Sequence, residues 1–118
     1  MQPVEVMKSH IEHFITRTVE GDLLENMAEN IQLHTPIGIF IGHEGVRKFN
    51  SILDEYLPQV TIDLKSVKFL KDQVIYKWNA MSPTASVKMG KCISHLQNDK
   101  IDHQWIQCEV DPEVMNQG

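Results

Sequence analysis

Long apolar runs are missing from this sequence of 118 residues, and none approaches the roughly 20 residues that a membrane-spanning helix needs. The first residues also lack the basic start and apolar stretch of a signal peptide, which favours a cytoplasmic protein. Only Cys92 and Cys108 occur, and their spacing supports neither a disulfide framework nor a zinc site. We therefore expect two free thiols, no bound metal and, since no cofactor motif is present, no cofactor.

Positive charge is also scarce. Eleven Lys and Arg residues stand against 16 Asp and Glu residues, which gives a formal net charge of -5. Such a surface repels a phosphate backbone on average, so nucleic acid is not an expected partner. Apolar residues make up 42% and charged residues 23%, the balance of a soluble globular protein. At this length the chain can bury one core, so residues 1–118 are expected to form a single domain.

The first half of the sequence has helical periodicity. Apolar residues recur at helical spacing from Val4 to Val19, which predicts an amphipathic first helix. Asp22 is suited to be the N-cap of a second helix, and Glu25 completes a capping box three residues later. This second helix is expected to occupy residues 21–30, "GDLLENMAEN".

An extended segment is predicted next, at "IQLHTP", because Pro36 disfavours helical geometry in the residue before it. The apolar stretch that follows is interrupted by glycines. It fits either an ordinary edge strand with its turn or the mouth of a pocket into which His34 points. A third helix is predicted for residues 42–57, where the helical period returns before Pro58.

After Pro58 the apolar period changes from about 3.6 to 2, which predicts that the rest of the chain forms a sheet. Turn-forming residues divide this half into four expected strands, and the polar tail from Asp111 onward is expected to be frayed. The strands are expected near residues 60–65, 73–81, 85–97 and 101–110.

This order of elements resembles the nuclear transport factor 2-like fold, in particular its SnoaL-like and ketosteroid-isomerase-like branches. The stretches that carry the resemblance are "GDLLENMAEN", "TPIGIFIGHEGVRKF" and "LQNDKIDHQW", in this order and over nearly the whole chain. The resemblance implies an α+β cone, in which three N-terminal helices pack in the concave face of a strongly curved, mostly antiparallel sheet. It also implies an apolar pocket that is open at one end and a homodimer that pairs through the convex face.

The known chemistries of this fold do not carry over. The tyrosine of ketosteroid isomerases matches Phe14, their catalytic aspartate matches Thr35, and their second acid matches Ser94. Threonine cannot shuttle a proton near neutral pH. Epoxide hydrolase relatives need an arginine between two aspartates, and the matching strands contain no arginine. We therefore expect neither standard activity.

The facing of the last strand stays open at this stage. A two-residue turn at Asn98 and Asp99 would place His103 and Trp105 on the same face as Ser94. A three-residue turn with a bulge would place Gln104, Ile106 and Cys108 there instead, and the resemblance favours this arrangement. The residues then expected to line the ligand pocket are Phe14, Thr35, Tyr76, Trp78, Ser94, Gln104 and Ile106. The residues expected at the dimer interface are Ile93, His95, His103, Trp105 and Gln107.

His34 is the candidate catalytic residue, because imidazole titrates near neutrality and the segment before Pro36 lies at the pocket mouth in the resembling proteins. The alternative is a half-exposed strand histidine, since the sequence identifies no carboxylate that would orient it. His10 and His13 lie three residues apart on the first helix, yet no third metal ligand accompanies them. We interpret both as solvated helix histidines.

The expected function is binding of a small, largely apolar or carbonyl-containing molecule, with isomerase or cyclase chemistry by proton transfer. The alternative is a non-catalytic ligand-binding or protein-interaction module of the same fold, because fold alone does not decide function.

Overall fold

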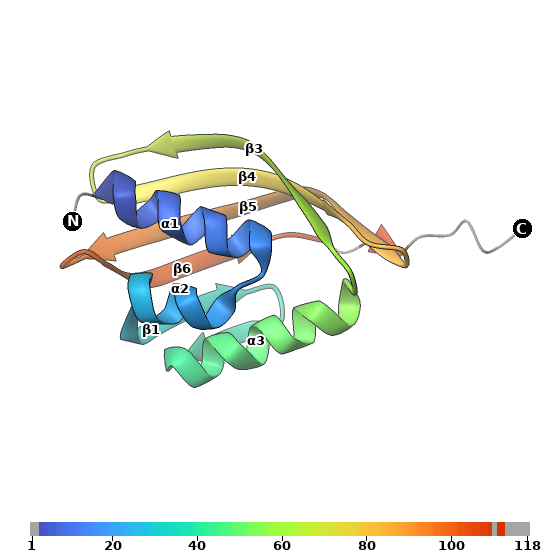
Figure 1. Cartoon of the computed structure of the whole chain (residues 1–118), viewed down its shortest axis with the longest axis horizontal. Helices are drawn as coiled ribbons and strands as arrows, with labels where there is room; N and C mark the ends of the chain where they lie inside the picture. The colour runs from blue at the N-terminus through green and yellow to red at the C-terminus, as the bar shows by residue number, and fades with distance from the viewer. Residues whose placement is uncertain (1–2, 110, 113–118) are drawn as a thin grey trace, which may run out of the picture.

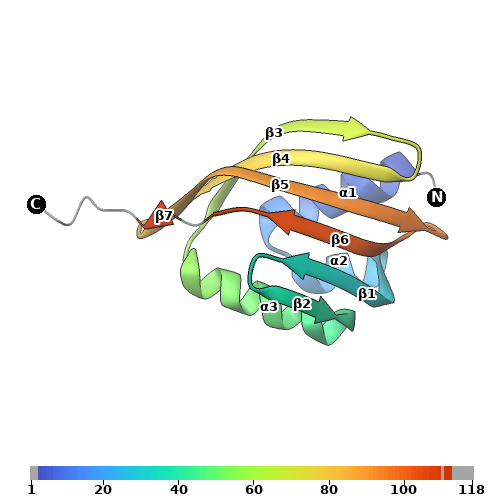
Figure 2. The same ribbon diagram turned by 180° about the vertical axis from the view of Figure 1, so that it is seen from behind.

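The structure is a computed structural model that describes residues 3–109 and 111–112 of the chain. A layer of helices packs against one face of a single curved sheet, and the view from behind shows the opposite face of the sheet toward the reader (Figures 1 and 2). No helix in the described ranges is long and apolar enough to cross a bilayer. The elements are α1 Pro3–Thr16, α2 Val19–Asn26, β1 Met27–Thr35, β2 Gly38–Ile41, α3 Gly42–Tyr56, β3 Thr61–Phe69, β4 Gln73–Met81, β5 Ala85–Gln97, β6 Lys100–Gln107 and β7 Asp111–Pro112.

The sheet is mixed but mostly antiparallel. Its strand order is β2-β1-β6-β5-β4-β3, and β7 pairs with the start of β5. The pairing of β1 with β6 is parallel and joins the two halves of the chain, while the other pairings are antiparallel. The α+β cone expected from the sequence is thus confirmed.

The sheet bends where its pairing is irregular. Register shifts occur between Leu64 and Ser66 on β3 and between Trp78 and Ala80 on β4, and bulges of this kind bend and twist a strand. Gly90 on β5 lies directly opposite Trp78, and a Cβ atom at Gly90 would overlap the indole ring. Glycine at this position therefore lets the tryptophan lie across the neighbouring strand.

The hydrophobic core fills the space between the helices and the concave face. Its members are buried, and burial of one such side chain contributes about 1.5–3 kcal/mol. They include Val6, Met7 and Ile11 of α1, Leu23 of α2, Val46 and Phe49 of α3, and Ile31, Leu33, Val74, Tyr76, Trp78, Val87, Cys92 and Ile101 of the sheet.

The boundaries of the first two helices differ from the sequence prediction. The first helix ends at Thr16 rather than Val19, and Arg17 adopts a positive φ of 59°. The second helix then begins at Val19, so Asp22 lies inside it and is not its N-cap. This helix ends at Asn26 because the chain continues as β1, which pairs with β6 at Met27 and again from Gln32, and this tertiary pairing overrides the helical propensity of the segment.

The stretch after Pro36 forms the edge strand β2, and Ile37 before it lines a cavity that opens at the end of the cone. Thr35 Oγ1 accepts a hydrogen bond from the Ile37 amide at 3.2 Å and donates one to the Gly38 carbonyl at 2.8 Å, which closes the turn between β1 and β2. Phe40 packs on Phe49 of α3 with 5.4 Å between ring centroids. The third helix and the four later strands occupy the predicted regions. The tail was predicted to be frayed from Asp111 onward, but Asp111 and Pro112 pair with β5 as β7, and residues 113–118 lie outside the described residues.

The facing of β6 follows the favoured arrangement, although the turn itself was predicted wrongly. Asn98 and Asp99 form a two-residue turn with φ values of 54° and 64°, as a type I′ turn requires. The bulge lies inside β6, since Leu96 pairs with Ile101 whereas His95 pairs with His103. This single extra residue turns Gln104 toward the core, where it is 3% exposed.

We predict that Gly90→Ala lowers the free energy of unfolding by about 1–3 kcal/mol, because the added methyl group forces the Trp78 ring to move. Urea unfolding followed by far-UV circular dichroism measures the loss. The matched control repeats the change in a Trp78→Leu background, where Gly90→Ala should cost much less. Equal losses in both backgrounds would show that the indole contact does not explain the glycine.

Candidate functional site

A cluster of polar side chains from five different helices and strands lies buried inside the cone. We call this the polar cluster. It comprises His10 of α1, Asp22 of α2, Tyr76 of β4, Ser94 of β5 and Gln104 of β6, and none is more than 4% exposed. Burying polar groups is unfavourable unless their hydrogen bonds are made, so the arrangement of the cluster decides its energy.

His10 is the centre of the polar cluster. Its Nδ1 donates a hydrogen bond to Asp22 Oδ2 at 2.7 Å. Its Nε2 lies 2.8 Å from Tyr76 Oη and 2.9 Å from Gln104 Nε2. Because the carboxylate can only accept, it fixes the tautomer in which the Nε2 lone pair faces Tyr76 and Gln104. The imidazole therefore presents a basic nitrogen to the interior.

The carboxylate of Asp22 is held from both sides. Asn26 Nδ2 donates to Asp22 Oδ1 at 2.9 Å and approaches Ser9 Oγ at 3.0 Å, while the other carboxylate oxygen receives the His10 proton. An orienting carboxylate of this kind stabilises an imidazolium ion when the histidine takes up a proton. The pair thus has the geometry of a general base with its positioning residue.

Hydrogen-bond donors surround the basic nitrogen. Gln104 Nε2 lies 3.2 Å from both Tyr76 Oη and Ser94 Oγ. Burial raises the pKa of Tyr76 well above its usual value, so the phenol keeps its proton and acts as a donor at neutral pH. Burial likewise raises the pKa of the neighbouring Cys92 thiol to about 12, which keeps it neutral. Neutral donors beside a base can stabilise an oxyanion that forms next to it.

The inner cavity beside the polar cluster is small. It has a volume of about 30 Å³, close to that of a single water molecule. Its polar wall includes His10, Tyr76 and Gln104, together with His13, Arg17, Asp22 and Asn50. The apolar wall includes Phe14, Leu33, Val46, Phe49, Leu53 and Ile106. The cavity can take one polar group of a ligand but not a whole molecule.

A larger apolar cavity opens at the end of the cone and forms its mouth. This mouth cavity has a volume of about 320 Å³, at the lower end of the range for small-molecule sites. Its lining comprises Pro36, Ile37, Phe49, Ile52, Leu53, Tyr56, Cys108 and Glu109. Phe49 and Leu53 line both cavities, so these two side chains of α3 form the partition between them.

Most residues predicted to line the pocket lie around the inner cavity. Phe14, Tyr76, Gln104 and Ile106 line it directly. Ser94 does not line the cavity, but its hydroxyl accepts a hydrogen bond from Gln104. Trp78 packs edge-to-face on Phe14 with 5.1 Å between ring centroids.

Thr35 is placed differently, since both of its side-chain hydrogen bonds lie within the β1–β2 turn. It therefore belongs to the rim of the mouth.

The expectation that His34, the candidate catalytic residue, points into the pocket is wrong. His34 lies on the outer face of the sheet, where its ring stacks on Trp105 with a centroid distance of 5.1 Å and an interplanar angle of 10°. Strand alternation is the reason, because Ile31 and Leu33 take the inward positions of β1. His34 cannot reach a molecule bound in the inner cavity.

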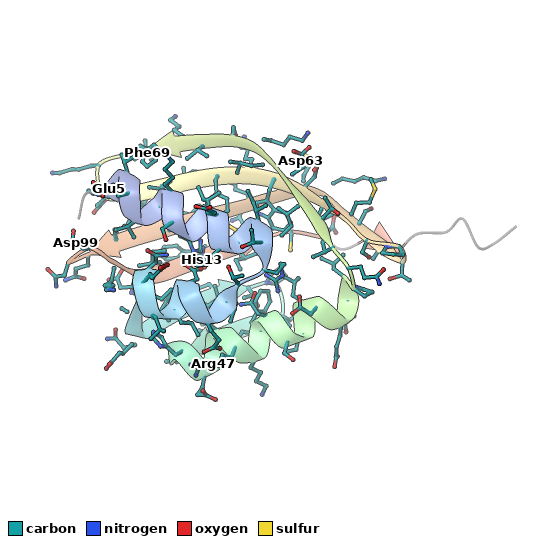
Figure 3. The ribbon with its side chains drawn as sticks, in the orientation of Figure 1. Glu5, His13, Arg47, Asp63, Phe69 and Asp99 are labelled. Atoms are coloured by element: carbon teal, nitrogen blue, oxygen red, sulfur yellow. The ribbon has the colours of Figure 1, made fainter. Side chains whose placement is uncertain are left out.

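The histidine that faces the interior is His10, and its interpretation as a solvated histidine is also wrong. His10 is 2% exposed, and its position follows Met7 at helical spacing and precedes Phe14 by one turn. This shared apolar stripe was the signal that could have identified it. His13, labelled in Figure 3, lies instead toward α2 and bonds Glu25 at 2.5 Å. Within the described ranges no three potential metal ligands gather together.

The five residues predicted for the dimer interface all belong to β5 and β6. His103 and Trp105 stack with 5.6 Å between centroids, and Ile93 pairs with Trp105 across the strands. Asp102 Oδ1 accepts a hydrogen bond from His95 Nδ1 at 2.6 Å, and this bond raises the pKa of His95. Ile93, His95, His103 and Trp105 are half-buried, while Gln107, paired with Lys91, is exposed.

Comparison with solved structures places the chain in a known fold. A nuclear transport factor 2-like protein of unknown function from Cytophaga hutchinsonii superposes with a TM-score of 0.73 and 11% identity, over 92% of this chain and 91% of that one. A proposed isomerase of the SnoaL-like family from Agrobacterium tumefaciens gives 0.71 and 14%, over 89% and 98%. TerC, co-crystallised with polyporic acid, gives 0.75 and 16%, over 91% of both chains.

The chain therefore has the nuclear transport factor 2-like fold, as found also in SnoaL-like proteins. No protein-family model matches the sequence, and no curated protein matches it. At such low identity the similarity establishes the fold and leaves the activity to be argued from the site.

We predict that Asp22→Ala lowers the free energy of unfolding by about 3 kcal/mol, because it leaves the buried His10 and Asn26 without their shared partner. Urea denaturation measures the change. Glu25→Ala is the matched control: it removes another histidine-bound carboxylate of α2, but an exposed one, and should cost less than about 1 kcal/mol. Similar losses for the two variants would contradict a special role for the buried pair.

Proposed function

We propose that this protein binds a small, largely apolar molecule with a carbonyl group and moves a proton on it, as isomerases and cyclases do. The observation that carries the proposal is the buried His10–Asp22 pair, in which the unprotonated Nε2 of His10 lies within hydrogen-bond distance of two donors. A core that needed only stability would gain as much from apolar residues of similar volume. The polar cluster is therefore best explained by chemistry on a bound molecule.

The proposed reaction uses side chains of this chain only. The ligand carbonyl oxygen enters between Tyr76 and Gln104 in place of their mutual contact, and it accepts a hydrogen bond from each. His10 Nε2 then takes a proton from the carbon adjacent to the carbonyl, and the electron pair of that C–H bond moves to the oxygen as an enolate. Tyr76 and Gln104 stabilise the enolate, and Asp22 stabilises the imidazolium. Where the enolate is conjugated with a C=C bond, return of the proton from His10 to the far carbon completes an isomerisation. Alternatively, the enolate attacks a second carbonyl and closes a ring, and the alkoxide so formed takes the proton back from His10.

The two cavities determine which shape of ligand can bind. Its polar end enters the inner cavity, and its apolar body occupies the mouth cavity between α3 and the β1–β2 turn. Phe49 and Leu53 move aside to let the two parts join. The co-crystal of TerC with polyporic acid supports the idea that this fold accommodates an organic molecule of modest size.

The second candidate is a non-catalytic binding or interaction module. One observation favours it: the side chains of the polar cluster satisfy one another, and the inner cavity holds only about one water molecule. In this case the mouth cavity alone would carry a ligand, or association would take place on the outer face.

We also propose that the protein forms a homodimer through the outer face of the sheet. The cross-strand pairings align five outward side chains in a row over five strands, and this face carries no helix in Figure 2. The row, which we call the outer row, comprises Ile39, His34, Trp105, Ile93 and Ile75. A mixture of aromatic and apolar groups with flanking histidines suits a moderately polar interface.

The test of catalysis begins with a ligand. A panel of planar polyketide-like, steroid-like and terpenoid ketones is titrated into the Trp105→Phe variant, which retains Trp78 near the inner cavity, and the fluorescence is recorded. The control is the Trp78→Phe variant, which retains Trp105 on the outer face and should give a much weaker response. Quenching through Trp105 alone would place the binding site on the outer face and contradict the proposal.

For a ketone that binds, we expect the protein to accelerate deuterium exchange at the carbon next to the carbonyl, measured by proton NMR in D2O. His10→Gln should lower the exchange rate by about a hundredfold or more, because glutamine cannot act as the base. Its fluorescence midpoint should stay within a few-fold of the wild-type value, and His34→Gln should exchange normally. Binding without any exchange would favour the non-catalytic module.

For the dimer, we predict that Trp105→Ala weakens self-association by about thirtyfold, since truncating a central aromatic residue of an interface typically costs about 2 kcal/mol. Sedimentation velocity over a concentration series measures the dissociation constant. Leu24→Ala is the control, because Leu24 is 79% exposed on α2, in the helical layer. A monomeric wild-type protein at all concentrations would contradict the proposed interface.

A further inference from the structure

The first helix ends with an arginine where helices of this kind usually have glycine. The Thr18 amide donates a hydrogen bond to the His13 carbonyl at 3.0 Å, and the Arg17 amide donates one to the Phe14 carbonyl at 3.3 Å. These two bonds form a Schellman motif, which needs a left-handed residue and favours glycine there. Arg17 occupies this position with a φ of 59°, a costly conformation for a residue that has a Cβ atom. The backbone alone therefore gives no reason for an arginine.

The side chain of Arg17 supplies the reason, because it bonds the end of α1 to α3. Its Nη1 donates a hydrogen bond to Asn50 Oδ1 at 2.8 Å. Its Nε and Nη2 donate to Asp54 Oδ1 at 3.2 and 2.8 Å. The guanidinium thus bonds two residues that lie about one turn apart on α3, as its planar fork of donors allows. These bonds offset the strain in the Arg17 backbone.

Arg17 is also part of the wall of the inner cavity. Arg17 and Asn50 both line this cavity. Away from the cavity the guanidinium contacts Asp54, whose side chain is 60% exposed, whereas that of Arg17 is 15% exposed. The guanidinium therefore lies between the inner cavity and the solvent. It covers the cavity where the junction of α1 and α2 approaches α3.

The bonds that hold the Arg17 side chain in place are easily broken. Those to Asp54 lie at the surface, where ion pairs contribute little and salt screens them. Asn50 does not depend on Arg17 for its position, because its Nδ2 also donates to the Val46 carbonyl at 2.9 Å. The strained backbone of Arg17 further favours release, and strained residues of this kind cluster at ligand clamps and switches. The side chain can therefore rotate away while α3 stays intact.

We propose that Arg17 closes a second entrance to the inner cavity, through the helical layer. In the closed state its guanidinium bonds Asn50 and Asp54 and excludes solvent from the polar cluster. In the open state these bonds are broken, and water or a small polar molecule reaches His10 without passing the mouth cavity. The closure is a property of the inner cavity itself, so it does not depend on the proposed reaction.

The experiment measures how fast the Cys92 thiol reacts, because Cys92 lines the inner cavity and is 0% exposed. The background variant is Cys108→Ser, which leaves Cys92 as the one thiol of the chain. The probe is methyl methanethiosulfonate, a small neutral reagent, and mass spectrometry follows the methyl disulfide that it forms. We expect Arg17→Gly to raise the reaction rate about tenfold or more, since opening no longer breaks the bonds to α3. Glycine suits the left-handed position, so the urea midpoint should stay within about 0.5 M of the background value.

Two further variants separate the Arg17 closure from a general loosening of the helices. Asp54→Asn removes only the exposed part of the closure and should raise the rate about threefold, since a surface ion pair contributes little. Arg47→Ala is the matched control. Arg47, labelled in Figure 3, also bonds α3 to α2, through Glu20 at 2.8 Å, but it does not line the inner cavity. Its loss should keep the rate within about twofold of the background.

The proposal is overturned if Arg17→Gly reacts at the background rate, or if Arg17→Gly and Arg47→Ala are accelerated equally. It is also overturned if the faster reaction of Arg17→Gly is matched by an equivalent fall in the free energy of unfolding, because the thiol is then reached by global unfolding. His10 is unchanged in every variant, so these rates decide the closure whether or not the proposed reaction takes place.

Discussion

The hydrogen bond between Asp22 and His10 is the interaction on which the interior of this protein depends. Two titratable groups so deeply buried are tolerated only because each satisfies the other, and because Asn26, Tyr76 and Gln104 complete the network. The network also joins α1, α2, β4 and β6, so it positions the helices over the sheet while it orients a basic nitrogen. Stability and proposed chemistry thus rest on the same atoms.

The size of the interior is set by the curvature of the sheet and by α3. Bulges in β3 and β5 bend the strands, and Gly90 lets Trp78 lie across β5, so little space remains between the concave face and the helices around the polar cluster. Phe49 and Leu53 then separate the inner cavity from the mouth. A ligand of ordinary size must displace these side chains, which would exclude water from the base once it is bound.

The fold itself leaves the activity open, because similar structures include a protein of unknown function and a proposed isomerase. What distinguishes this chain is its own set of interior residues. By the resemblance, Phe14, Thr35 and Ser94 match positions where ketosteroid isomerases carry a phenol and two acids, and the base that we propose is His10 instead. The proposed association uses the outer face and the proposed catalysis uses the interior, so the two can be tested independently.

The sequence by itself determined the class of fold, the third helix and the long strands, because apolar periodicity and proline positions are local properties. It also favoured an inward Gln104, although by the wrong turn. Only the tertiary structure decided the rest. It made residues 27–30 part of β1, a strand that pairs with β6 at Met27 and again from Gln32, and it placed His34 outward because Leu33 fills the core. It also brought His10 to Asp22 and to Tyr76, 66 residues away in the sequence, a contact that no local pattern encodes.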